Sequence, residues 1–175
     1  MKYTVVDGHC DTPMELWLRQ ENLRSNTCQV SLERAKKLSG YVQFYAFCTV
    51  WLEQDGSFEA HYAAALEHFN RQLDENKDQI VRCKNEADAR AAIGSGKCGA
   101  FLSIEGAEAI SCDPGKLELA CAQGVRMIAP AWNAQNALTG SCMTGGGLTA
   151  QGKEFVRRAQ KLGMILDVSH ISEKA

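Results

Sequence analysis

Imidazole and carboxylate side chains stand close together directly after the first apolar run of the chain. His9 and Asp11 lie in the segment DGHCD, just behind the run Tyr3 to Val6. In an extended segment, residues i and i+2 project to the same side, so this pair can bind one cation. The alternative is a half-buried histidine followed by an aspartate that caps a helix starting near Pro13. Two residues alone leave both interpretations open.

Two further apolar runs end in residues that can bind a metal. Glu105 closes the run Phe101 to Ile104, and His170 follows the segment Ile165 to Ser169. A carboxylate has two oxygens and can bridge two cations roughly 3.5–4 Å apart. The alternatives are a surface or helix-capping carboxylate at Glu105 and a hydrogen-bonded histidine at the edge of the core at His170. Potential metal ligands at the ends of three separate apolar runs form a pattern, whereas a single one would have little meaning.

The apolar runs are the strands that would position these residues. They are short, rich in Val, Ile, Phe and Tyr, and nearly continuous, which is typical of strands buried on both faces of a parallel sheet. We predict strands over Tyr3 to Val6, Tyr41 to Val50, Ala100 to Ile104, Met127 to Ala131, and Met164 to Val168.

Amphipathic stretches lie between these runs and predict helices. They include Phe58 to Leu73, Glu86 to Ile93, Leu117 to Ala122, and Phe155 to Leu162. The first of these carries His61 and His68, which we expect at its surface or rim. Alternating strands and helices fit an open doubly wound sheet or part of a (β/α)8 barrel. Barrel enzymes place catalytic groups at the C-terminal ends of different strands, which favours the barrel.

Composition limits the partners of the chain. It has 175 residues with a net charge of -2, so we expect one domain over residues 1–175 that binds neither nucleic acid nor membrane. The N-terminus has no apolar segment of signal-peptide length, which makes the cytoplasm the expected compartment. The eight cysteines include no C-x-x-C pair, so they are interpreted as small buried residues rather than as a thiolate zinc site. The cluster Gly145 to Gly147 is interpreted as a flexible turn.

Several segments together resemble the renal (membrane) dipeptidase family, and its bacterial members in particular. They are DGHCD, SIEGAEAI, RMIAPAWNAQN, GLTAQGKEFV and LDVSHIS, and they occur in the order found in that family. The resemblance runs from about Val6 to the end of the chain and is vaguer between Asn22 and Gly96.

The resemblance implies a (β/α)8 TIM barrel, here truncated after about five β/α units, with a two-zinc site. His9 and Asp11 look like ligands of the first zinc, Glu105 like the catalytic bridging carboxylate, and His170 like a ligand of the second. The family supplies another histidine from a later strand, so one zinc is expected in this chain. The implied reaction is hydrolysis of a dipeptide by a zinc-bridged hydroxide.

The resemblance also implies substrate-binding residues. Trp132 stands where animal members carry a histidine thought to contact the substrate, and Asn133 follows it. Trp132 could instead be a core or rim aromatic residue. The expected partners are a small dipeptide and a second copy of the chain in a homo-oligomer, since an incomplete barrel would expose strand edges.

Two other functions stay open at this point. Another barrel amidohydrolase acting on a small amide is one, although such enzymes usually begin with His-x-His rather than the His9-x-Asp11 pattern. The other is a non-catalytic, metal-binding fragment that needs a partner or a C-terminal half.

Overall fold

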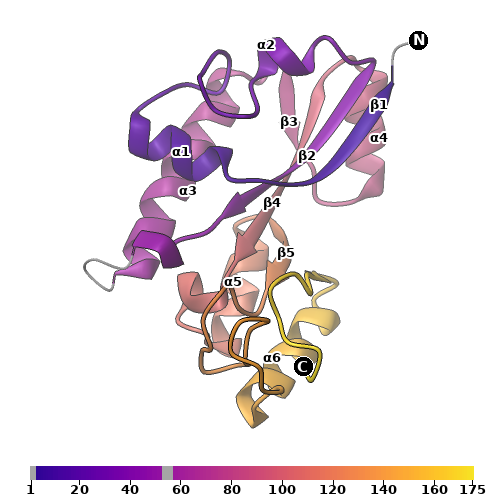
Figure 1. The fold of residues 1–175 in the computed structure, drawn as a ribbon. Helices are drawn as coiled ribbons and strands as arrows, with labels where there is room; N and C mark the ends of the chain where they lie inside the picture. Colours follow the sequence, from indigo (N-terminus) through magenta and orange to yellow (C-terminus); the bar gives the residue numbers. More distant parts are fainter. Residues whose placement is uncertain (1–2, 53–56) are drawn as a thin grey trace. The chain divides into compact units, whose positions relative to one another are not determined.

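The computed structural model describes residues 3–52 and 57–175 (Figure 1), and strands alternate with helices along these residues. The strands are β1 (Thr4–Cys10), β2 (Gly40–Phe47), β3 (Ile80–Arg82), β4 (Cys98–Glu105), β5 (Val125–Ala129) and β6 (Ile165–Leu166). The α-helices are α1 (Thr12–Arg19), α2 (Leu32–Ala35), α3 (Phe58–Glu75), α4 (Glu86–Gly94), α5 (Leu117–Ala122) and α6 (Ala150–Lys161). Short 3-10 helices span Val50–Leu52, Ala107–Ile110 and Pro114–Lys116.

The chain divides into two compact units. Unit 1 comprises Met1–Phe47 and Ala63–Leu102, and unit 2 comprises Cys48–Tyr62 and Ser103–Ala175. In unit 1 the strands pair in the order β1-β2-β4, and β3 also pairs with β4; in unit 2, β5 and β6 follow the end of β4. The registers of β1 with β2, β3 with β4, and β5 with β6 are all parallel. Parallel strands joined by helices confirm the predicted α/β class, while the assignment of residues 1–175 to one domain stays a prediction.

Side-chain caps explain where several helices begin. The Asn85 side chain accepts the backbone N–H of Asp88 (2.9 Å) at the start of α4, and Thr149 accepts that of Gly152 (3.0 Å) at the start of α6. Each cap satisfies a backbone donor that has no partner within its helix. Within the described ranges, no helix combines the length and the apolar character needed to cross a membrane.

Aromatic side chains form much of the core of unit 1. Phe69 of α3 lies 4.8 Å from Tyr45 and 6.0 Å from Phe47, measured between ring centroids. Phe44 and Phe101 stack at 4.8 Å between β2 and β4. Such rings bury a large apolar area and fix α3 against the strands.

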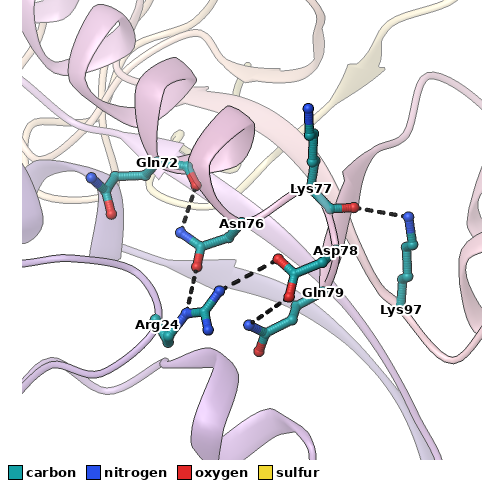
Figure 2. A network of polar contacts seen from close by, with 7 residues as sticks. All are labelled: Arg24, Gln72, Asn76, Lys77, Asp78, Gln79 and Lys97. Carbon is teal, nitrogen blue, oxygen red and sulfur yellow. Dashed lines mark hydrogen bonds and ion pairs between the residues drawn. The ribbon is translucent and has the colours of Figure 1, made fainter.

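The irregular segment after α1 is tied to the end of α3 by polar contacts (Figure 2). Arg24 donates through Nε to Asn76 Oδ1 (3.0 Å), and Asn76 donates to the backbone oxygen of Gln72 (2.8 Å). The Gln72 side chain accepts the backbone N–H of Leu23 (2.8 Å). A loop without strand or helix partners needs such side chains to satisfy its backbone.

The structure differs from the sequence-based expectations in several details, among them the extent of β1, which reaches Cys10, and of β6, which is limited to Ile165–Leu166. β3 was not predicted, because its three residues are too few for a recognisable pattern and Val81 is 39% exposed. β2 ends at Phe47 rather than Val50, since Val50 begins a 3-10 helix. The prediction of a surface position for His68 was wrong, because this residue is only 8% exposed.

Candidate active site

The end of β1 carries the first pair of candidate ligands. His9 Nε2 lies 3.4 Å from Asp11 Oδ1, and both side chains are more than two-fifths exposed. The pairing of β1 with β2 shifts register between Asp7 and Cys10, and such irregularities commonly redirect side chains beside functional sites. The backbone N–H of His9 donates to Asp7 Oδ1 (3.2 Å), which stabilises this irregular part of the strand.

Asp11 is the N-cap residue of α1, but its carboxylate does not cap the helix. The backbone oxygen of Asp11 accepts the N–H groups of Met14 (3.0 Å) and Glu15 (3.2 Å) instead. Pro13 occupies the first turn of the helix, where its missing N–H costs nothing. Asp11 therefore starts the helix with its backbone, and its side chain points to His9.

The end of β4 and the segment after β6 carry the second pair, which lies within unit 2. Glu105 Oε1 and His170 Nε2 are 3.0 Å apart, with the two side chains 10% and 31% exposed. Glu105 is the last residue of β4, and His170 follows β6 at the end of the turn that Asp167 makes with Ser169 N–H (2.8 Å). Both residues thus occupy C-terminal strand ends, as expected for a barrel site.

Trp132 and Asn133, which follow β5, lie beside His170. The Asn133 Oδ1 atom is 3.0 Å from His170 Nδ1. The rings of Trp132 and His170 have centroids 6.2 Å apart and are tilted at 48°. Unit 2 therefore brings four of the predicted site residues together, namely Glu105, Trp132, Asn133 and His170.

Two residues of this site were missed by the sequence reasoning. The buried Ser141 donates its hydroxyl to the backbone oxygen of Asn133 (2.5 Å), and the backbone N–H of Cys142 donates to the backbone oxygen of His170 (2.7 Å). Both belong to the segment 140–147, which we call the glycine-rich loop. Gly145 and Gly146 have positive φ values of 69° and 95°. The turn lies at residues 142–144, just before the predicted glycine cluster, and its contacts left no pattern in the sequence.

The spacing of both pairs suits a bound zinc ion. Zinc binds imidazole nitrogen and carboxylate oxygen at about 2.0–2.2 Å, so two of its ligands in a tetrahedral arrangement lie about 3.4 Å apart. The separations here are 3.4 Å for His9 and Asp11 and 3.0 Å for Glu105 and His170. A carboxylate oxygen only accepts, so at this spacing it faces either an imidazole N–H or a cation that both atoms bind.

The neighbouring thiol of Cys10 is buried and is a less suitable ligand than the exposed side chains of His9 and Asp11. Burial raises the pKa of the Cys10 thiol from 9.0 to about 12, which keeps it protonated at neutral pH. Metal binding by cysteine requires the thiolate. Five of the eight cysteines are buried and all eight are free, in agreement with their interpretation as small buried residues.

Known proteins resemble the chain along its whole length. The family model of membrane dipeptidases (peptidase family M19) matches residues 1–175. Dipeptidase tcpJ of Claviceps purpurea (strain 20.1) is 29% identical over 133 residues, which are 70% of this chain and 31% of that protein. The matched segments span only 31% to 37% of the length of the curated relatives. These relatives are therefore about three times as long as the segments that match this chain.

Solved structures show the same fold. Dipeptidase AC, a metallopeptidase of family M19, is 25% identical with a TM-score of 0.84, covering 99% of this chain and 58% of that one. A metallopeptidase from Rhodobacter sphaeroides, solved with a phosphinate mimic of the dipeptide L-Ala-D-Ala, is 23% identical with a TM-score of 0.82, covering 99% and 60%. The parallel α/β fold of this chain thus matches part of the TIM barrel of M19 dipeptidases. With a family model that matches all of its residues, the chain belongs to the membrane dipeptidase family, peptidase family M19.

Proposed function

We propose that the chain supplies the metal ligands and part of the substrate site of a zinc-dependent dipeptidase. The observation that carries this proposal is the contact of Glu105 Oε1 with His170 Nε2 at 3.0 Å in a chain of the M19 family. A buried carboxylate that faces an imidazole at C-terminal strand ends is the arrangement that metallohydrolase barrels use.

The proposed ligands are His9, Asp11, Glu105 and His170. Glu105 would bridge two ions, as the family resemblance implies, and it is the more buried of the two carboxylates, with a side chain 10% exposed against 45% for Asp11. When bound, zinc activates water near neutral pH and polarises the peptide carbonyl.

The residues of the chain have distinct tasks in this proposal. Glu105 would hold the cations, and its negative charge would offset the cost of placing them in a partly buried site. Trp132 forms one wall beside His170, where it would contact the dipeptide and exclude water from the scissile bond. Ser169 is not assigned as a nucleophile, since the proposed reaction needs none.

A small dipeptide is the proposed substrate. The dipeptidase tcpJ and dipeptidase AC are named for this activity, and the Rhodobacter sphaeroides metallopeptidase was solved with a mimic of L-Ala-D-Ala. L-Ala-D-Ala and L-Ala-L-Ala are therefore the first two substrates to compare.

The test is a hydrolysis assay with zinc added to the chelator-treated protein. Release of free alanine from either dipeptide, abolished by Glu105→Gln and by His170→Gln, would support the proposal. Glu154→Gln is the matched control, because Glu154 is an exposed carboxylate on α6. Zinc binding without hydrolysis of any dipeptide would favour the non-catalytic alternative, and hydrolysis that survives both substitutions would contradict the assigned ligands.

A further inference from the structure

The His170 ring lies among three groups of unit 2 that together restrict its orientation. Asn133 faces Nδ1 at 3.0 Å, Glu105 faces Nε2 at 3.0 Å, and the Trp132 ring lies 6.2 Å away between centroids. The two ring nitrogens of an imidazole lie on different edges of the ring. With Nδ1 facing Asn133 and Nε2 facing Glu105, Nε2 is the nitrogen that could reach a metal beside Glu105.

The His170 backbone is restricted as well. Its φ is 68°, in the left-handed region that costs a non-glycine residue of order 1 kcal/mol or more and persists only where the surroundings impose it. Those surroundings are the glycine-rich loop, whose Cys142 N–H donates to the His170 oxygen (2.7 Å) and whose Ser141 pairs with Ile171 in an antiparallel bridge. The ring therefore projects from a backbone that the loop has already placed.

The backbone of Asn133 is held in place by the glycine-rich loop. The Ser141 hydroxyl donates to the Asn133 backbone oxygen (2.5 Å) and accepts the N–H groups of Met143 (3.1 Å) and Thr144 (3.2 Å). Ser141 has no solvent exposure. The same loop thus positions both partners of the contact between Asn133 and His170, which is the mark of a prearranged pair rather than of two surface side chains that meet by chance.

We propose that Asn133 is a positioning residue for His170: its Oδ1 accepts the Nδ1–H proton, so that Nε2 presents its lone pair to a metal beside Glu105. A histidine ligand that donates its other ring N–H to a fixed acceptor keeps one tautomer and one orientation. Oδ1 is the atom of the Asn133 amide that faces Nδ1, and an amide oxygen can only accept. The consequence for metal binding rests on the proposed function, whereas the hydrogen bond itself does not.

The first test is zinc binding by calorimetry. Asn133→Ala should lower the affinity for the second, more weakly bound zinc, which Glu105 and His170 would hold, about 10- to 100-fold, the usual effect of losing an outer partner of a metal ligand. Asn133→Asp keeps the acceptor and should retain the affinity of the wild type or exceed it. Gln135→Ala is the control, since Gln135 is an exposed amide of the same segment and should bind zinc unchanged.

The second test needs no metal. At a pH low enough to protonate histidine, the His170 Nδ1–H should be protected from solvent exchange in ¹⁵N-resolved NMR spectra of the metal-free chain. This protected proton should vanish in Asn133→Ala and remain in Asn133→Asp and Gln135→Ala. His170→Gln identifies the signal, and thermal unfolding verifies that each variant is folded.

The outcomes separate the two proposals. If the wild type shows the protected proton but binds no zinc, the positioning contact stands and the dipeptidase proposal fails. If Asn133→Ala keeps both the proton and the zinc affinity, the positioning role is overturned. An Asn133→Ala variant that binds zinc normally but has a raised KM for dipeptides would assign Asn133 to the substrate instead.

Discussion

His170 and Glu105 face one another at 3.0 Å between Nε2 and Oε1, although Glu105 ends β4 and His170 comes after β6. β6 brings the histidine, and β4 brings the carboxylate, so their meeting depends on the parallel arrangement of strands around β5. The contact brings together two of the metal ligands that the resemblance to this family implies.

Substitution of Glu105 should affect metal binding more than any other single change. Glu105→Gln keeps the shape of the side chain but removes the charge that would balance both ions, so we expect the zinc affinity to fall by at least about 100-fold. Calorimetric titration measures this. Unchanged affinity and stoichiometry in Glu105→Gln, with Glu154→Gln as the matched control, would contradict the bridging role.

The chain is expected to bind one zinc ion tightly. Catalytic zinc usually has three protein ligands and one open position, and of the proposed ligands only His9, Asp11 and Glu105 make a set of three for one ion. Native mass spectrometry with added zinc measures the stoichiometry. Two tightly bound ions per chain would mean that a further ligand of the second ion has been missed.

The glycine-rich loop should not tolerate a side chain at Gly140. A Cβ atom there would lie 1.6 Å from the backbone oxygen of Gly145, so Gly140→Ala must displace the loop. We expect the free energy of unfolding to fall by about 1–3 kcal/mol, together with a weaker affinity for the second zinc, because its ligand His170 loses its support. Urea denaturation and calorimetry measure the two effects.

Gly94→Ala is the matched control for this change. A Cβ atom at Gly94 meets nothing within 4 Å, and the residue lies at the end of α4 in unit 1. The substitution should leave stability nearly unchanged or raise it slightly. Equal stability of Gly140→Ala and Gly94→Ala would show that the loop adapts more easily than its contacts suggest.

Trp132 should report on metal binding through its fluorescence. Its ring lies 6.2 Å from that of His170, and a cation near an indole changes its electronic surroundings. Zinc should therefore alter the emission of the wild type and of Trp17→Phe, whereas Trp132→Phe should lose most of the change. A full response in Trp132→Phe would place the metal away from this residue.

Stability should decrease at alkaline pH through the buried thiol of Cys10. Burial raises the pKa of this thiol from 9.0 to about 12, so the unfolded chain releases the proton at a lower pH than the folded chain. The stabilising contribution is complete below pH 9 and is lost as the pH rises toward 12. Urea denaturation under reducing conditions should show a smaller decline for Cys10→Ala than for the wild type.

Cys142→Ala is the control for the alkaline decline, because Cys142 is exposed. Its stability should follow that of the wild type across this pH range. The prediction fails if Cys10→Ala and the wild type decline in parallel.

Much of the fold could be predicted from the sequence because parallel strands buried on both faces are nearly continuous in apolar residues. This pattern is strong at β2 and β4, where most residues are buried. It failed at β3, whose three residues derive their structure from pairing with β4 rather than from a pattern of their own.

The sequence by itself determined the kinds of candidate ligands, their places at the ends of strands, and the family to which the chain belongs. Periodicity and short motifs act over a few neighbouring residues, so they can show where a strand ends and which residues come directly after it. Only the tertiary structure decided that Asn133 lies against His170, that Ser141 supports Asn133, and that His170 has a positive φ of 68°. Contacts of this kind join residues from separate elements, and their geometry arises when the chain packs, because no local pattern encodes the distance between two strand ends.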